Sequence, residues 1–254
     1  MANIWITALA KDPASVQAVT QHLKQYGLGV GGHFWIDDLE KFAWFDVLDE
    51  MVKHNATAWV ILSNEAEIAK PSVRYGLNAL AIALNGRTGT DMPIVWIGAA
   101  GTEPLPTVFG AALKVDDKTP SWQAKVVAMA HRTRKAPAAP YRISMHAHSR
   151  FGQWYEVGPV GDTWAGVMFG VAGAQIDFHG VGPKGDLPEK AVLEYTQKDM
   201  KLALGDTEYT AWAVQNVVDP GQSYFVRVRG SPTSLLFGPL AQGDDAEVYV
   251  LRCS

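Results

Sequence analysis

Apolar residues follow two different patterns in the two halves of the chain. In the first half, short runs of β-branched and aromatic residues alternate with segments whose apolar residues recur every three or four positions. Such runs are typical of buried strands, and the wider spacing is typical of one-sided helices. In the second half, runs rich in valine, threonine and aromatic residues are separated by glycine- and proline-containing turns, as in antiparallel sheets. The pattern therefore predicts an α/β domain followed by an all-β domain.

The first half predicts strands that alternate with helices. The strand candidates are the apolar runs at 3–9, 28–36, 58–62, 93–98 and 111–115. The helix candidates are the segments after Pro13, at 42–51, at 71–84 and at 121–131. Alternation through short connections requires right-handed crossovers. We therefore expect a five-stranded parallel sheet of the flavodoxin type, with flanking helices, over residues 1–132.

The second half predicts strands only, after a linker. Residues 133–140 combine two prolines with alanines and basic residues, which is linker composition. The strand candidates beyond it are 141–145, 163–169, 175–178, 210–215, 223–228 and 247–251. Their spacing predicts an antiparallel β-sandwich or small barrel over residues 141–254. Residues 187–199 leave open a turn of helix.

Composition narrows the function classes. The 254 residues, 48% of them hydrophobic, suit two domains of ordinary size. A formal net charge of −4 gives no general attraction for phosphate backbones or anionic lipid, so we expect neither nucleic acid nor a membrane as partner. The single cysteine, Cys253, excludes an internal disulfide. The first residues lack the basic region of a signal peptide, and no apolar stretch approaches the roughly 20 residues that span a bilayer. The expected location is the cytoplasm.

Five features of the first half follow one another in a recognisable order: 4–8 as the first strand, 34–37 (Phe-Trp-Ile-Asp) as the end of the second, 58–63 (Ala-Trp-Val-Ile-Leu-Ser) as the third, Ser72 at the next helix start and 93–98 as the fourth strand. This order resembles that of the Toll/interleukin-1 receptor (TIR) domain family and its flavodoxin-like relatives. Together the five features cover roughly the first half of the chain. The resemblance implies a bacterial-type signalling domain that binds a protein partner or itself.

The resemblance also implies where a catalytic residue would stand. Catalytic TIR domains carry a glutamate on the helix after the third strand, where it handles the ribose of NAD while the nicotinamide bond is cleaved. Nucleoside deoxyribosyltransferases, which are loosely similar, need a glutamate on the same helix. Here residues 72–78 read Ser-Val-Arg-Tyr-Gly-Leu-Asn, without a carboxylate. An oxocarbenium-like transition state needs a nearby carboxylate, which neither Tyr75 nor Asn78 supplies. The hypothesis is therefore a non-catalytic TIR-like signalling or scaffold protein whose β domain recognises a partner or ligand.

The main alternative is an enzyme, either an NAD-cleaving N-glycosidase or a nucleoside-transferring enzyme, with a displaced carboxylate. Acidic residues follow the second strand, at the edge where open α/β sheets bind ligands: Asp37, Asp38, Glu40, Asp46, Asp49 and Glu50. Asp37 or Glu40 could do acid/base work beside an apolar wall such as Trp44. The simpler interpretation is a solvated helix with acids near its N-terminus. In the enzyme interpretation the ligand is NAD or another nucleotide, and the sequence defines no other cofactor.

The same edge predicts a set of ligand-binding residues. Arg74, one turn into its helix, could hold a phosphate or carboxylate, although a surface ion pair with Glu65 or Glu67 explains it equally well. The glycines at 29–32 lie in the second strand, where strand packing explains them better than a phosphate site does. The candidate ligand-binding residues are Ser63, Ser72, Arg74, Trp44 and Asn78.

The second half offers a further alternative, a metal- or carbohydrate-binding β module. His146 and His148 would share one face of a strand, a spacing that can hold a metal. The third ligand would have to come from elsewhere, such as His179 or Asp177. Histidine pairs without a third partner are more often structural.

Aromatic residues enrich the predicted β domain. Such rings serve sugar-binding sandwiches as stacking platforms and serve any β domain as core. Trp164 and Trp212 lie in alternating strands, so we expect them in the core. Trp154 and Tyr155 lie between Gly152 and Gly158, and we expect them to be exposed.

Overall fold

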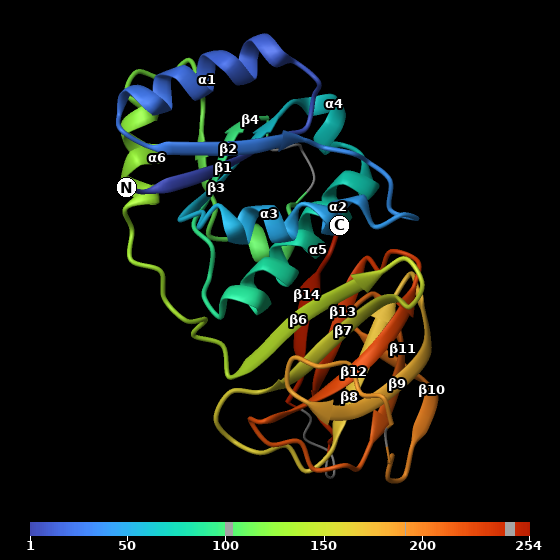
Figure 1. The fold of residues 1–254 in the computed structure, drawn as a ribbon. Helices are drawn as coiled ribbons and strands as arrows, with labels where there is room; N and C mark the ends of the chain where they lie inside the picture. Colours follow the sequence, from blue (N-terminus) through green and yellow to red (C-terminus); the bar gives the residue numbers. More distant parts are fainter. Residues whose placement is uncertain (100–103, 191, 242–246) are drawn as a thin grey trace. The chain divides into compact units, whose positions relative to one another are not determined.

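The computed structural model describes residues 1–99, 104–190, 192–241 and 247–254 (Figure 1). The chain divides into two compact units, Met1–Ala136 and Pro137–Ser254, called the α/β domain and the β domain below. The boundary falls inside the segment 133–140, whose described residues form neither helix nor strand. Arg134 Nη1 donates to the Ala56 carbonyl at 3.3 Å, and the Lys135 carbonyl accepts from the Asp91 amide at 3.0 Å, so this part of the segment is bonded to the α/β domain.

The α/β domain contains a five-stranded parallel sheet, as the sequence predicts. Its strands are β1 (Asn3–Ala8), β2 (Gly29–Phe34), β3 (Ala58–Ser63), β4 (Ile94–Gly98) and β5 (Leu113–Val115). Their order is β2-β1-β3-β4-β5, and every neighbouring pair is parallel. This is the doubly wound order, in which ligands bind outside the carboxyl ends of the strands.

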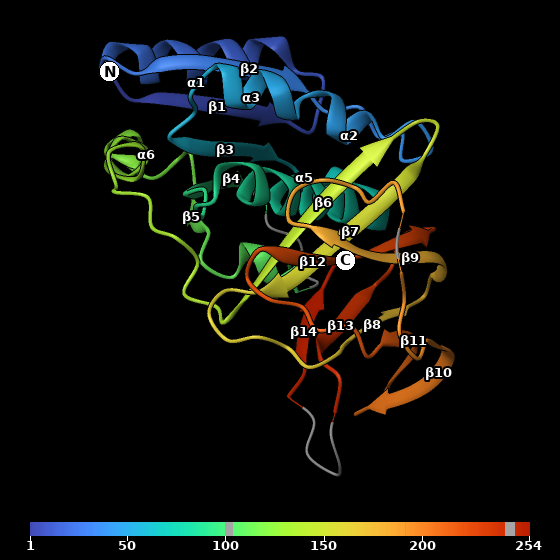
Figure 2. The ribbon, with the colours of Figure 1, turned by 60° about the horizontal axis from the view of Figure 1, so that its bottom comes forward.

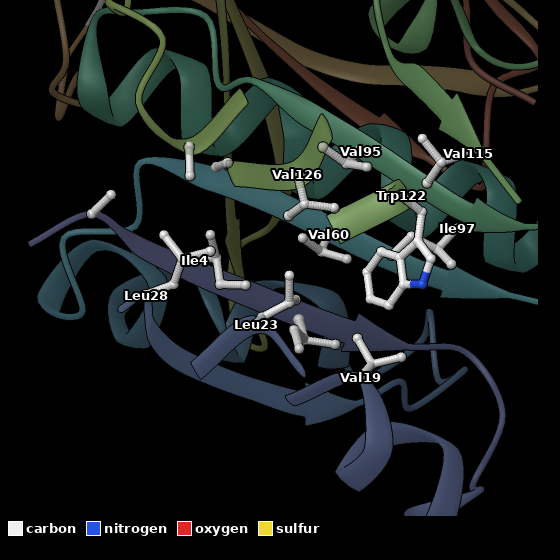
Figure 3. Close-up of a cluster of buried hydrophobic side chains, with 14 residues drawn as sticks. Ile4, Val19, Leu23, Leu28, Val60, Val95, Ile97, Val115, Trp122 and Val126 are labelled. Carbon is white, nitrogen blue, oxygen red and sulfur yellow. The ribbon is translucent and has the colours of Figure 1, made fainter. Parts of the chain in front are cut away.

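Helices cover both faces of this sheet (Figure 1). They are α1 (Pro13–Gln25), α2 (Ala43–Asp46), α3 (Leu48–Lys53), α4 (Glu65–Ile68), α5 (Pro71–Thr88) and α6 (Trp122–Ala130), with a 3-10 turn η1 (Thr107–Phe109). Side chains of α1 and α6 pack on one face of the sheet, where Leu23 and Val126 meet Ile4, Val60 and Val95 (Figure 3). The other face carries the alternate strand residues, and α5 packs there with α2, α3, α4 and η1.

Two helices differ from the sequence prediction, and the glycines of β2 agree with it. The predicted helix at 42–51 is interrupted at Val47 and forms α2 and α3. Helix α5 continues past Asn85 to Thr88, and Gly89 then takes the left-handed conformation, φ +66°, that ends many helices. The glycines of β2 are explained by strand packing, because a Cβ atom at Gly31 would lie 2.9 Å from the Trp5 ring.

The β domain consists of two antiparallel sheets (Figure 2), which confirms the predicted all-β class. One sheet has the order β6-β7-β12-β9 and the other the order β10-β11-β8-β13-β14. The strands are β6 (Tyr141–His148), β7 (Gly152–Pro159), β8 (Val167–Ala172), β9 (Gln175–Pro183), β10 (Gln197–Leu204), β11 (Thr207–Val214), β12 (Gln222–Arg229), β13 (Ser234–Pro239) and β14 (Tyr249–Arg252). Contacts between the sheets, such as Tyr155 with Phe169 at 5.5 Å between ring centroids, form the core.

Several expectations for this half were wrong. Strand β7 was not foreseen, and Trp154 and Tyr155, expected to be exposed, are buried within it. Trp164 and Trp212 are buried as expected, but Trp164 lies before β8 and forms an isolated bridge with Val218. The described part of 187–199 contains no helix, and its end belongs to β10.

Candidate functional site

The carboxyl edge of the parallel sheet brings two predicted site residues into direct contact. Asp37 follows the end of β2, and Ser72 lies in the first turn of α5. The Ser72 hydroxyl donates a hydrogen bond of 2.8 Å to Asp37 Oδ2, at an exposed position. This bond ties the loop after β2 to the start of α5.

The face of α5 next to this bond is occupied by an indole. Gly76 lies one turn after Ser72, on the same side of the helix. A Cβ atom at Gly76 would lie 2.6 Å from Trp35 Cζ2 and 3.4 Å from Leu39 Cδ2. Trp35 is itself only 5% exposed. The tryptophan therefore fills the space that any longer side chain at position 76 would need.

Replacing Gly76 tests this packing. We expect Gly76→Ala to lower the free energy of unfolding by about 1–2 kcal/mol, because overpacking outweighs the gain in helix propensity. Gly86→Ala is the matched control, since it is the same substitution at an exposed position of α5 and should be neutral or stabilising. Chemical denaturation of both variants measures the difference. Equal stabilities would contradict the close packing of Trp35 on Gly76.

The opposite side of α5 carries polar atoms without partners. Arg74 and Asn78 are one turn apart on that side. Asn78 is fully buried, and in the part of the chain that the structure describes neither of its amide atoms, nor Arg74 Nε, has a hydrogen-bond partner. An unpaired buried polar group costs about 1–3 kcal/mol. These two side chains of α5 could therefore hold a water molecule or a polar ligand.

The remaining predicted ligand-binding residues, Ser63 and Trp44, differ in whether their polar atoms have partners. Ser63 Oγ donates to the Ala99 carbonyl and accepts from Trp96 Nε1 at 2.6 Å. Trp44 is buried in α2, where its ring meets the edge of Phe45 at 5.5 Å. The Ser63 hydroxyl is therefore engaged, whereas Trp44 Nε1 is buried and has no hydrogen-bond partner among the described residues.

The acidic residues after β2 are mostly solvated. Glu40 is exposed. Asp38 Oδ1 accepts from the Lys41 amide at 3.1 Å, and its Oδ2 lies 3.2 Å from Lys41 Nζ. These interactions, the backbone hydrogen bond first, lower the pKa of Asp38. Glu67 pairs with Lys70 at 2.8 Å, and among the described residues Arg74 forms no ion pair with Glu65 or Glu67. The structure thus groups Asp37 with Ser72 and leaves the other acids apart from them.

The histidine pair of β6 has separate partners. His146 Nε2 lies 2.7 Å from Glu156 Oε2, and His148 Nδ1 accepts from the Arg150 amide at 3.1 Å. His179 is bonded to the Tyr224 hydroxyl at 2.7 Å. Among the described residues, no group of three or more histidine, cysteine, aspartate and glutamate side chains could hold a metal ion.

Sequence reasoning missed the buried carboxylate of the β domain. Glu156 is 4% exposed. It accepts hydrogen bonds from Ser223 Oγ at 2.7 Å and from the Gly185 amide at 2.8 Å, in addition to its contact with His146. Burial raises the pKa of Glu156, but these hydrogen bonds outweigh burial and lower it below its usual value. The carboxylate lies between the serine and the histidine, so the order needed for a serine nucleophile activated by histidine is absent from this group.

Comparisons with known proteins identify no family. No family model matches the chain, and no curated protein matches it. Two crystal structures of a two-domain esterase active on acetylated mannans are similar to it, one of them co-crystallized with mannopentaose. Their TM-scores are 0.32 and 0.31 at 8% identity, over 98% of this chain and 90% of the esterase chain. TM-scores of this size establish no common fold, and nothing about function follows from them. Over the described residues, no helix combines the length and the apolar character needed to cross a membrane.

Proposed function

We propose that this chain is a non-catalytic TIR-like signalling or scaffold protein. Its α/β domain mediates assembly with a protein partner or with itself, and its β domain recognises a partner or ligand. The observation that carries this proposal concerns α5 at the carboxyl edge of the sheet, where a catalytic carboxylate would stand. The helix has no carboxylate, and its face beside Asp37 is filled by Trp35 on Gly76.

Asp37 is poorly suited to replace the missing glutamate. Its carboxylate is exposed and is held by the Ser72 hydroxyl. A charge stabilises an oxocarbenium-like transition state strongly only where water is excluded. In water, unit charges about 4 Å apart interact by only about 1 kcal/mol. We therefore expect negligible cleavage of glycosidic bonds.

A turnover assay tests the absence of catalysis. The purified chain is incubated with NAD and with a panel of nucleosides, and the products are separated by chromatography. We expect no free base above the rate without protein, while an NAD-cleaving enzyme assayed in parallel confirms that product is detected. Base release that increases in proportion to the amount of protein would overturn the non-catalytic assignment.

The second candidate is an N-glycosidase or nucleoside-transferring enzyme that uses Asp37. It is favoured by the Asp37–Ser72 bond, which holds a carboxylate against the first turn of α5. Asp37→Asn retains an oxygen that can accept this bond, so we expect a change in the free energy of unfolding within about 0.5 kcal/mol. Any turnover should then fall in Asp37→Asn, or in the double variant with Glu40→Gln. Turnover that both variants retain would eliminate this candidate.

A further inference from the structure

One end of the four-stranded sheet carries a row of stacked side chains on its outer face. Trp154, Arg227 and Phe178 are direct cross-strand neighbours on β7, β12 and β9. The Arg227 guanidinium lies 5.5 Å from the Trp154 ring centroid and 5.6 Å from that of Phe178. The Arg227 stem passes Gly152, where a Cβ atom would lie 3.5 Å from Arg227 Cδ. Stacking of this kind holds the guanidinium in place.

Charged side chains and exposed aromatic rings lie next to this row. Asp177 accepts from Arg227 Nε at 2.6 Å and also from Arg229 Nε. One carboxylate against two guanidiniums leaves a net positive charge, and the Arg229 side chain is 71% exposed. Phe151 and Phe178 are 57% and 48% exposed. We call this surface the arginine–aromatic patch; its residues are Phe151, Trp154, Asp177, Phe178, Arg227 and Arg229.

The other end of the same outer face is covered by the chain itself. Glu156 and Phe225, which lie on that face, are buried. The segment after β9 reaches them there, since the Gly185 amide bonds to Glu156 and Pro188 lies against Gly182. No such cover conceals Phe178 or Arg229. Arginine and aromatic residues together are the composition of energetically important protein–protein contacts.

The α/β domain carries an acidic segment whose charge is opposite to that of the arginine–aromatic patch. Residues 36–50 include six carboxylates and one lysine, and they begin with Ile36, which is 62% exposed. Asp38 pairs with Lys41 and Asp49 with Arg87. Glu40, Asp46 and Glu50 are exposed and have no ion-pair partner among the described residues. This acidic stretch offers carboxylates to arginines and an apolar side chain to exposed rings.

We propose that the arginine–aromatic patch of one copy binds the acidic stretch 36–50 of a second copy. The two surfaces differ and every chain carries both, so the contact is head-to-tail and extends into a ring or an open chain of copies. This inference rests on the proposed assembly function and names the surfaces that perform it.

Charge reversal on each surface tests the contact by sedimentation velocity of the full chain. We expect the wild type to form species larger than one chain at about 0.05 M salt and to lose them at about 0.5 M, because salt screens exposed charges. Arg229→Glu and the double variant Glu40→Lys/Glu50→Lys should each associate at least about tenfold more weakly. Arg132→Glu makes the same charge change at an exposed position outside the patch and should associate like the wild type.

Mixing the two impaired variants gives the sharpest result. The patch of the double variant and the acidic stretch of Arg229→Glu are both intact, and the two altered surfaces carry opposite charges, so the mixture should regain the association that each variant alone has lost. Wild-type association that Arg229→Glu leaves unchanged would overturn the inference while the assembly function stands. A wild type that remains a single chain at low salt would overturn both the inference and self-assembly, and would leave assembly with a different protein as the proposed function.

Discussion

Lowering the pH from about 6.5 to about 4 is expected to cost the β domain about 3 kcal/mol of folding free energy through one histidine. His179 is 3% exposed, and burial, with a smaller contribution from Lys198, lowers its pKa from 6.5 to about 4. Between these values the unfolded chain binds a proton that the folded chain does not. Stability from the neutral histidine is therefore complete above pH 6.5 and falls as the pH drops towards 4.

The double variant His179→Phe/Tyr224→Phe is the control for this result. It removes the titrating ring together with the hydroxyl that bonds to it at 2.7 Å, so no unpaired polar group remains. Urea denaturation at a series of pH values should show that the wild type loses about 3 kcal/mol more than the variant. Burial also lowers the pKa of His33 to about 4. Because His33 is present in both proteins, its contribution to the pH dependence of stability cancels when the two are compared. Parallel pH profiles would contradict the account.

Removal of the Glu156 carboxylate is expected to have the largest effect of any single substitution described here. Glu156→Ala should destabilise the β domain by about 3–5 kcal/mol, because removing one member of a buried charged group leaves its partners unpaired. Those partners are His146, Ser223 and the Gly185 amide.

An exposed glutamate of the same domain provides the matched control. Glu208, 70% exposed and 3.4 Å from Lys201, should tolerate alanine within about 0.5 kcal/mol. Chemical denaturation of the two variants measures the contrast. A cost below about 1 kcal/mol for Glu156→Ala would mean that the network does not hold the sheet together. The pKa of Glu156 is lowered, so its contribution should disappear only as the pH falls below the usual glutamate range, through the folded-state pKa.

The parallel sheet was predictable because each strand and helix is marked by a pattern within its own short stretch of sequence. Each of its inner strands is a continuous apolar run, and the helix starts at Pro13 and Pro71 are marked by proline in the first turn. Strand β7 lacked such a signal. Both of its faces are buried, by the core on one side and by the segment around Gly185 on the other, so the alternation of apolar and polar residues is lost. Trp154 and Tyr155, which lie between Gly152 and Gly158, were expected to be exposed instead.

The site was predictable only in part, because some of its features depend on packing between segments that are distant in the sequence. The sequence places Asp37 and Ser72 at the same edge of the sheet, and the structure brings them together. The role of Trp35 was missed, although a signal existed: glycine inside a helix costs about 1 kcal/mol relative to alanine and usually has a packing reason. The burial of Asn78, whose amide atoms have no partner in the described part of the chain, could not be foreseen, because burial of an amide depends on residues distant in the sequence.

The most direct test of the proposed assembly function is the mass of the wild-type chain as a function of its own concentration. Sedimentation equilibrium at about 0.15 M salt, near physiological ionic strength, gives this mass without reference to any ligand. We predict that the weight-average mass rises above that of a single chain as the concentration increases. A mass that stays at one chain over the whole range would contradict self-assembly as the function of this protein.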